Sequence, residues 1–234
     1  TRFLPRPVRP AAAAALLLLS LGAPGPRAEA APGDIVEFPI PSGGSAYEIM
    51  VGPDGNLWFV EPSNVGSYEV NKIGRITPDG ALTEFPTGDN EVGFSITSGP
   101  DGNLWFTTQY AGYDAEWGVT WGGGQIGRIT PNGAVTLFNA ATAYGSPHSI
   151  TAGPDGNLWF TSVDSYSIGR ITPNGAETEF PIPWVEFGID IAAGPDGNVW
   201  FTTGGNIGRI TPGGVITRFP IPTPTSGAYG ITAW

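Results

Sequence analysis

Short apolar runs separated by glycine, proline and asparagine dominate the chain, and no stretch keeps a helical period. Each run pairs a tryptophan with a phenylalanine, so a large apolar residue falls on both faces of a strand. These pairs are Trp58-Phe59, Trp105-Phe106, Trp159-Phe160 and Trp200-Phe201. A sheet that is apolar on both faces has to be packed between two other sheets, as in radially stacked blades.

Two motifs recur at intervals of 39 to 54 residues. Gly-Pro-Asp-Gly-Asn, which precedes the Trp-Phe pair, begins at Gly52, Gly99, Gly153 and Gly194. Ile-Gly-Arg-Ile-Thr-Pro begins at Ile73, Ile126, Ile168 and Ile207. A turn and a Thr-x-Phe segment such as Thr83–Pro86 follow the second motif. This interval is typical of propeller blades.

Each repeat predicts four strands joined by tight turns. Proline sets φ at the second position of a Pro-Asp-Gly turn, and glycine accepts the left-handed conformation that follows. The pattern therefore predicts an all-β β-propeller of four-stranded blades, with repeats beginning near residues 47, 94, 148, 189 and 229.

The repeats predict four complete units and two partial ones. A single outer strand is expected at Val36–Pro39 and a single inner strand at Tyr229–Ala233. These two cannot pair, because two further strands would separate them in a blade. We therefore expect a truncated chain, a fragment of a larger propeller, with a gap or an unpaired sheet edge between the two segments.

The first residues have the pattern of a secretory signal peptide. Three arginines precede the apolar run Ala11–Leu19, and the small-residue segment Ala28–Ala30 follows it. The run is shorter than the roughly 20 residues that a membrane-spanning helix needs. Residues 1–30 are therefore expected to be cleaved, leaving 31–234 as a single exported domain, secreted or periplasmic, with no membrane attachment.

The charge of the chain limits which binding partners are expected, and its lack of cysteine limits how it can be stabilised. The chain has 10 basic and 21 acidic residues, and the leader contains four of the basic ones. Such an acidic chain is not expected to bind nucleic acid, although it would favour cationic ligands or metal ions. With no cysteine, its stability has to come from burial alone.

The segments Gly-Pro-Asp-Gly-Asn-Leu-Trp-Phe-Thr, Ile-Gly-Arg-Ile-Thr-Pro and Thr-Glu-Phe-Pro-Ile-Pro resemble the blades of the virginiamycin B lyase family. The resemblance implies a seven-bladed propeller, monomeric at full length. It also implies a carbon-oxygen lyase that uses Mg²⁺ to open the ester of a cyclic depsipeptide, a streptogramin B antibiotic, by elimination.

The resemblance also suggests catalytic residues. The family lyase has Pro-His-x-Ile segments in two successive blades, with an acidic residue two positions before the second. Residues 146–150 match one such segment and contain His148, the only histidine. At the second, Phe187 replaces the acidic residue, and Glu186 is its neighbour. We therefore consider His148 and Glu186 as the catalytic pair. A neutral histidine with a purely structural hydrogen bond is the alternative.

Long loops and aromatic residues gather on the face where His148 is expected. Thirteen residues separate Phe59 from Ile73 and nineteen separate Phe106 from Ile126, against seven and five in the later repeats. Loops of this length are usually functional. The aromatic residues expected to contact a ligand are Tyr47, Phe94, Tyr110, Tyr113, Trp117, Trp121 and Trp184. Packing against one another to cover the blades is the alternative.

Two carboxylates are candidate ligands of a hard cation, Glu61 after the first Trp-Phe pair and Glu48 beside Tyr47. They are equally consistent with solvated surface carboxylates. One arginine per repeat is a structural feature rather than an anion site, and these arginines are expected to pair between blades with the aspartates of the turn motif. The pairs would join Arg75, Arg128, Arg170 and Arg209 to Asp54, Asp101, Asp155 and Asp196.

Three functions stay open at this point. The segment around His148 favours an ester-opening lyase acting on a small molecule or cyclic peptide. The lack of a second histidine favours an exported propeller that binds a ligand or protein without catalysis. A propeller lactonase that uses carboxylates and a divalent cation is the third.

Overall fold

The computed structural model describes residues 35–62, 71–88, 92–114, 119–139, 145–184, 186–223 and 227–232. Side chains are described in these ranges except at 92, 109–122 and 139. The chain divides into Thr1–Val36 and Glu37–Trp234, and all the strands belong to the second unit. The expected signal peptide lies outside the described residues.

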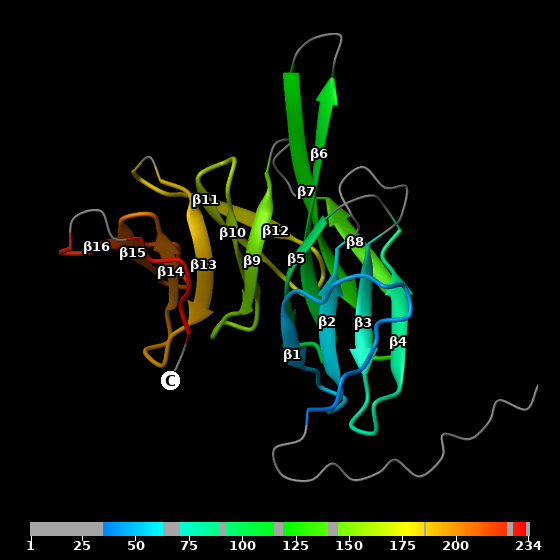
Figure 1. Cartoon of the computed structure of the whole chain (residues 1–234). Coiled ribbons are helices and arrows are strands. Elements are labelled where there is room, and N and C mark those ends of the chain that lie inside the picture. The colour runs from blue at the N-terminus through cyan, green and yellow to red at the C-terminus, as the bar shows by residue number, and fades with distance from the viewer. Residues whose placement is uncertain are drawn as a thin grey trace, which may run out of the picture. The chain divides into compact units, whose positions relative to one another are not determined.

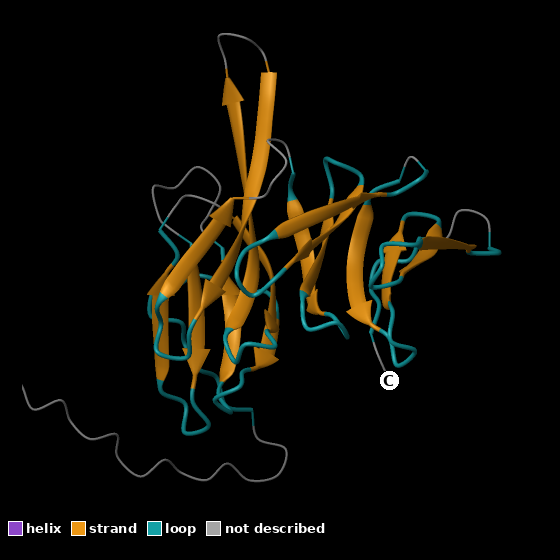
Figure 2. Ribbon diagram, turned by 180° about the vertical axis from the view of Figure 1, so that it is seen from behind, coloured by secondary structure: helices purple, strands orange, loops and turns teal. Residues whose placement is uncertain are grey.

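Four antiparallel sheets of four strands make up the second unit, and the described residues contain no helix (Figures 1 and 2). The first sheet contains β1 (Ile49–Val51), β2 (Leu57–Glu61), β3 (Lys72–Ile76) and β4 (Leu82–Pro86). The second contains β5 (Val92–Ser98), β6 (Leu104–Asp114), β7 (Val119–Ile129) and β8 (Val135–Asn139). The third contains β9 (Pro147–Ala152), β10 (Leu158–Ser162), β11 (Ser167–Ile171) and β12 (Glu177–Pro181). The fourth contains β13 (Gly188–Ala193), β14 (Val199–Thr203), β15 (Asn206–Ile210) and β16 (Ile216–Pro220). The predicted all-β propeller blades are confirmed.

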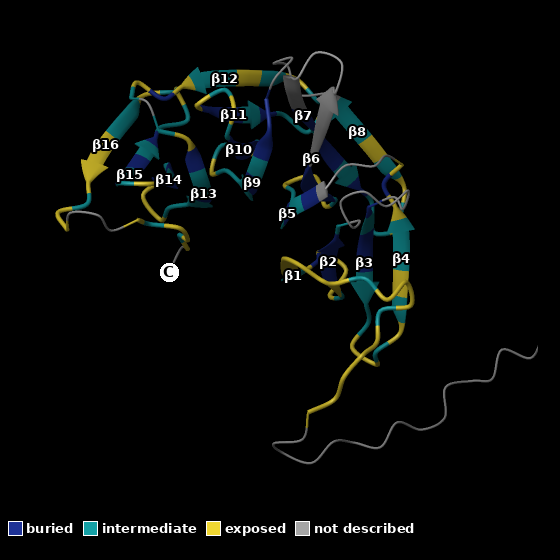
Figure 3. Ribbon diagram, turned by 45° about the horizontal axis from the view of Figure 1, so that its top comes forward, coloured by how far each residue is buried: buried dark blue, intermediate teal, exposed yellow. Residues whose placement is uncertain are grey.

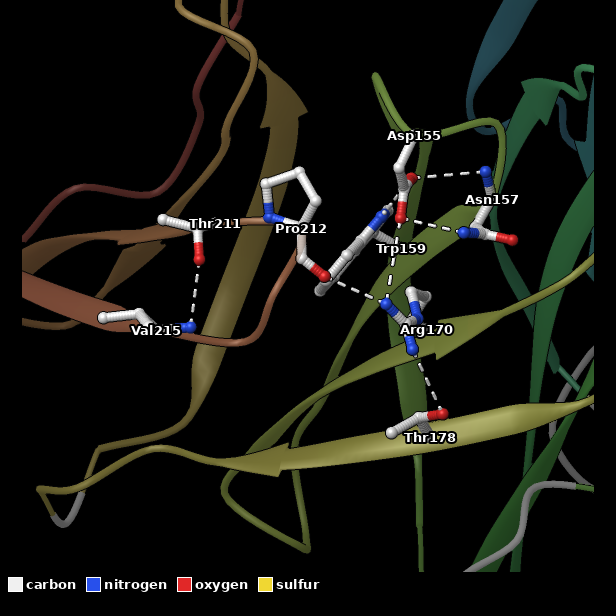
Figure 4. A network of polar contacts seen from close by, with 8 residues as sticks. All are labelled: Asp155, Asn157, Trp159, Arg170, Thr178, Thr211, Pro212 and Val215. Carbon is white, nitrogen blue, oxygen red and sulfur yellow. Dashed lines mark hydrogen bonds and ion pairs between the residues drawn. The ribbon is translucent and has the colours of Figure 1, made fainter.

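The turn motif fixes the tryptophan of each sheet, as the third sheet illustrates (Figure 4). The indole Nε1 of Trp159 donates a hydrogen bond of 2.9 Å to Asp155, which also accepts from the side-chain amide of Asn157 at 2.8 Å. The motif glycine Gly153 allows this approach, because an added Cβ would lie 2.3 Å from Trp159 Cδ1. The motif is therefore a cap for the buried indole as well as a turn.

The repeat arginine joins neighbouring sheets by a contact that differs from the expected one. Arg170 lies over the rings of Trp159 and Phe180, with 5.5 and 5.4 Å from Cζ to their centroids. Its Nη1 donates 3.0 Å to the carbonyl of Pro212 in the next sheet, whereas its ion pair with Asp155, at 3.9 Å, stays within one sheet (Figure 4). The predicted inter-blade arginine–aspartate pairing is therefore wrong, because the aspartate is already oriented by its own tryptophan.

Apolar clusters fill the space between successive sheets. Trp58 packs with Leu104 and Ile129, and Trp159 packs with Val199 and Ile210. The first three repeat tryptophans are fully buried, as predicted, but Trp200 is only partly buried. It lines a hollow of about 400 Å³ on the outer side of the fourth sheet, where the described residues contain no further sheet.

The face of the first sheet that is turned away from the second sheet is also not covered by the described residues. Leu57 is 41% exposed, whereas Leu104 at the same position in the second sheet is fully buried. Residues 36–39 and 229–232, where single strands were expected, form no strand. Ala233 lies outside the described residues. Both end sheets of the described chain thus have an unpaired face.

We predict that Trp159→Ala costs about 3–5 kcal/mol of unfolding free energy, because it empties a fully enclosed site between two sheets. Urea unfolding followed by circular dichroism measures this cost. Trp200→Ala is the matched control and is expected to cost less, since its indole is partly exposed. Equal costs would contradict the inter-sheet role of the tryptophan.

Candidate functional site

One residue at the start of each inner strand occupies the same place in successive repeats. Figure 3 shows β1, β5, β9 and β13 on the inner side of their sheets. We call these places the mouth positions; they hold Tyr47, Phe94, His148, Ile189 and Tyr229. The two tyrosines are 61% and 76% exposed, while the other three are half-buried. His148 is therefore bordered by apolar side chains at an accessible position.

The imidazole of His148 is held by contacts from both neighbouring sheets. Its Nδ1 lies 2.9 Å from the carbonyl oxygen of Ile189, and its ring centroid lies 5.3 Å from that of Phe94 at an interplanar angle of 32°. A carbonyl only accepts, so Nδ1 is the donor. In the neutral ring Nε2 then carries the lone pair, as a general base requires.

A second set of side chains, one position after the mouth, links the inner strands. Glu48 accepts from the amide of Ile96 at 3.1 Å, and Ser95 accepts from Ile150 at 3.2 Å. These bonds bridge neighbouring sheets, so the sequence has a polar residue here for a structural reason.

Asp190 continues this set in the fourth sheet. Ser149 Oγ donates to its carboxylate at 2.6 Å, and the amide of Ile231 donates at 2.8 Å. The inner strand of the third sheet is thereby connected through Asp190 to the segment that follows the fourth. The alternation of residue types along the chain gave no sign of this role for Asp190.

Opposing electrostatic effects act on the carboxyl group of Glu48. The residue as a whole is exposed, but its carboxyl end is withdrawn from solvent, and this burial raises its pKa. The charge of Asp190 acts in the same direction, whereas hydrogen bonds from Ser95 and Ile96 and the charge of His148 act against it. Charged groups of the third and fourth sheets therefore act on the carboxyl group of Glu48, which directly precedes β1 of the first sheet.

Glu61 belongs to a separate cluster at the end of β2. It is 4% exposed, accepts a hydrogen bond from Ser42, and has one carboxyl oxygen without a partner. Burial raises the pKa of Glu61, and the adjacent Glu84 raises it further. Glu84 in turn pairs with Lys72 at 3.6 Å. The two predicted metal ligands, Glu48 and Glu61, thus have different partners.

Glu186 is held by the fourth sheet. Its carboxylate accepts from Thr203 and Asn206, both at 2.5 Å, and lies 3.8 Å from Arg218. Although burial alone would raise its pKa, these hydrogen bonds and this charge lower it. Trp184 lies beneath the same arginine, 5.3 Å from its Cζ to the ring centroid. Among the described residues, Glu186 and His148 therefore have no hydrogen-bond partner in common, although Ile189, which holds His148, belongs to the same sheet as the partners of Glu186.

Three of the aromatic residues predicted to contact a ligand lie on the strands of the β6–β7 hairpin, namely Tyr110, Tyr113 and Trp121. Its strands extend beyond their partners β5 and β8, which pair with them only as far as Gln109 and Gln125 (Figure 1). In register, Tyr110 pairs with Gly123 and Tyr113 with Thr120. Trp121 pairs with Gly112. Trp117 lies outside the described residues.

The base of this hairpin meets the histidine segment. Gly124 packs so closely on Pro147 that an added Cβ would lie 2.6 Å from its Cδ. Gly124 pairs with Gln109, so the base of the hairpin lies against the start of β9. Tyr110, Tyr113 and Trp121 lie farther along the hairpin, and their side chains are outside the described ones.

Comparisons with known proteins show the family of the chain. The profile of the virginiamycin B lyase family matches residues 27–113 and 111–234. The chain belongs to this family. The virginiamycin B lyase of Staphylococcus aureus is 35% identical over 86% of the chain and 64% of that protein, with a TM-score of 0.73. A streptogramin B lyase structure is 32% identical over 85% and 61%, with a TM-score of 0.69. The chain spans less than two thirds of these lyases.

A third lyase structure and a more remote one extend the comparison. A catalytically inactive histidine-to-alanine variant of the S. aureus lyase, with quinupristin, is 36% identical over 83% of the chain and 62% of that protein, with a TM-score of 0.70. A gluconolactonase from Xanthomonas campestris, 17% identical over 79% and 64% with a TM-score of 0.54, shares the fold alone. A search of curated protein sequences found no match.

The described side chains do not assemble a magnesium site of the kind that the virginiamycin B lyase resemblance implies. No three acidic, histidine or cysteine residues among them lie close enough to hold an ion. Glu48 is engaged with the second sheet, and Glu61 with Ser42 and Glu84. We therefore derive no catalytic step through a metal.

We predict that Glu61→Gln makes the protein more stable at pH 7. The folded pKa of Glu61 is raised, so its protonated form favours folding below the unfolded pKa, and this contribution is lost as pH rises through the folded value. The amide abolishes that loss, so the gain over wild type should disappear in mildly acidic buffer. Urea midpoints between pH 4 and pH 8 measure it.

Glu84→Gln is the matched variant of opposite sign. Although burial would raise the pKa of Glu84, hydrogen bonds from Ser42 and the charge of Lys72 lower it, so its ionised form favours folding. This variant should be less stable than wild type at pH 7. Equal shifts in the two variants would contradict the assigned environments.

Proposed function

We propose that the protein opens the ester of a cyclic depsipeptide by elimination, with His148 as the general base. The observation that carries this proposal is the bond from Nδ1 of His148 to the Ile189 carbonyl, which leaves Nε2 to accept a proton. Membership of the virginiamycin B lyase family, and the quinupristin bound by a related inactive lyase, support the substrate class.

The chemistry needs one proton acceptor beside an ester. A base removes a proton from the carbon next to the one that carries the ester oxygen, a carbon–carbon double bond forms, and the carboxylate leaves. Nε2 of His148 would take that proton. The half-buried Phe94 and Ile189 on either side would contact the apolar part of the ligand and limit access of water.

Several features of the proposal concern the surroundings of the base. Tyr113 belongs to the β6–β7 hairpin, whose base packs on Pro147 beside His148, and we propose that this hairpin contacts the substrate. We also propose export through the leader, and a requirement for Mg²⁺ that the family resemblance implies. For Glu186 to act in catalysis, its carboxylate would have to give up its hydrogen bonds with Thr203 and Asn206.

A ligand-binding propeller without catalysis is the second candidate. The observation in its favour is the commitment of Glu186 to Thr203, Asn206 and Arg218, which leaves His148 without that carboxylate as a partner. On this hypothesis the mouth residues and the hairpin bind a ring-bearing ligand that is released unchanged. A lactonase would instead hydrolyse its ester.

Incubation of the protein with quinupristin separates the three functions by product mass. Elimination gives a linear product with the mass of the substrate, hydrolysis adds one water, and binding alone changes neither structure nor mass. The reaction is followed by liquid chromatography and tandem mass spectrometry, with magnesium or with a chelator. An ¹⁸O-water arm labels a hydrolysed product and leaves an eliminated one unlabelled.

We expect a linear product of unchanged mass, formed at least about 100-fold more slowly by His148→Ala, because general-base catalysis typically contributes 10²–10⁴-fold. Val215→Ala, an exposed residue between β15 and β16 that is not a mouth position, is the control and should react at the wild-type rate. Absence of turnover together with measurable quinupristin binding would favour the second candidate.

A further inference from the structure

The inner strands share an irregularity at the mouth. Between β9 and β10 the register shifts between Phe160 and Ser162, which leaves His148 and Ser149 outside the regular pairing. The same kind of shift separates Gly93 from Ile96 in β5 and Gly188 from Ile191 in β13. Such bulges turn backbone groups and side chains away from the ladder and are frequent beside active sites.

A buried threonine replaces the missing strand bond at each bulge. Thr107 Oγ1 accepts from the amide of Ser95 at 3.2 Å, and Thr161 Oγ1 accepts from that of Ser149 at 3.1 Å. The fourth sheet repeats the contact, with Thr202 accepting from Asp190 at 3.1 Å. Each threonine ends the Trp-Phe-Thr segment of its sheet and is at most 1% exposed.

The same hydroxyls reach forward to the next sheet. Thr107 donates 2.6 Å to the carbonyl of His148, and Thr161 donates 3.5 Å to the carbonyl of Ile189. Thr107 therefore holds the backbone carbonyl of His148. Thr161 contacts the Ile189 carbonyl, which accepts the hydrogen bond from the Nδ1–H of His148. Phe94, in the bulge of the preceding sheet, covers the ring.

We propose that Thr107 and Thr161 are positioning residues that fix His148 as the Nδ1–H tautomer and present Nε2 as the proton acceptor at the mouth. A free neutral imidazole favours the opposite tautomer, so the protein has to supply the bias. The chemical purpose of this device rests on the proposed function, but the tautomer itself is a property that can be measured without substrate.

The chain indicates that the hydroxyl is not needed merely to stack sheets. At the same position the first sheet has Val60, which is fully buried and packs in the core with Ile96. Its side chain fills the space beside Gly93, where an added Cβ would lie 2.4 Å from Val60 Cγ1. Valine is thus an accepted isostere, and Thr→Val removes the hydrogen bonds with little change in shape.

Nitrogen NMR can test the assignment directly, because His148 is the only histidine in the chain. In protein labelled with ¹⁵N-histidine, long-range ¹H–¹⁵N correlations at a pH where the ring is neutral identify the protonated nitrogen. We expect Nδ1 to be protonated in the wild type. A ring protonated mainly at Nε2 would overturn the proposal.

Thr161→Val and Thr107→Val test the positioning role. We expect each to lower the Nδ1–H to Nε2–H ratio about fivefold, the order expected from loss of one hydrogen bond. Thr87→Val is the control, since it removes a buried threonine hydroxyl bond, to the carbonyl of Asn71, that involves none of the partners of His148, and it should leave the ratio unchanged. Urea unfolding of all three shows that they fold and compares their structural cost.

Two outcomes would overturn the positioning role: an unchanged ratio in both Thr107→Val and Thr161→Val, or an equal change in Thr87→Val. Ring opening of quinupristin is measured on the same samples as a separate result. The expected tautomer without ring opening would reject the proposed function alone, whereas ring opening by a protein with the other tautomer would reject this inference alone.

Discussion

The packing of one tryptophan per sheet against the next sheet is the contact on which the structure depends. With no cysteine in the chain, burial has to supply the stability, and each sheet is apolar on both faces. The indole can be buried because its single polar atom is satisfied by the aspartate of the preceding turn. The arginine above it then donates to the proline carbonyl of the next sheet. Turn, core and inter-sheet contact are thus one unit.

This unit explains the repeated sequence better than strand propensity does. The glycine of Ile-Gly-Arg-Ile is required because the phenylalanine of the neighbouring strand occupies the place of its Cβ, as Phe160 does at Gly169, with 2.1 Å to an added Cβ. Each conserved element of the repeat within the chain therefore has a steric or polar partner. A repeat that lost its tryptophan would also leave an aspartate and an arginine without their contacts.

The strands and their order could be predicted from the sequence, because two motifs per repeat mark both the buried strands and their turns. The partner of the arginine could not, since aspartate and proline recur equally often and their distances do not follow from counting. The bulges were also missed, because the bulge residues Ser95, Ser149 and Asp190 are not all of one type. The buried threonine after the last three Trp-Phe pairs was the available sign, as a polar residue inside an apolar run needs a partner.

For the site, His148 was found because it is the only histidine, and its carbonyl partner in Ile189 came only from the structure. Glu186 illustrates the opposite case. It stands in a suggestive place in the sequence, but residues 17 to 32 positions later hold its carboxylate. A suggestive place in the sequence therefore does not show that a side chain belongs to a site, because each sheet contributes its own hydrogen-bond partners.

The threonine contacts have a consequence for how such a protein can change over time. At His148 and Ile189 they reach the mouth residue through its backbone carbonyl, so the contact itself does not depend on which side chain stands there. Tyrosine, phenylalanine, histidine and isoleucine all occur there within this one chain. Duplicated sheets can therefore acquire new chemistry one residue at a time while the scaffold keeps its stability, and a family of this kind can diversify its ligands faster than its architecture.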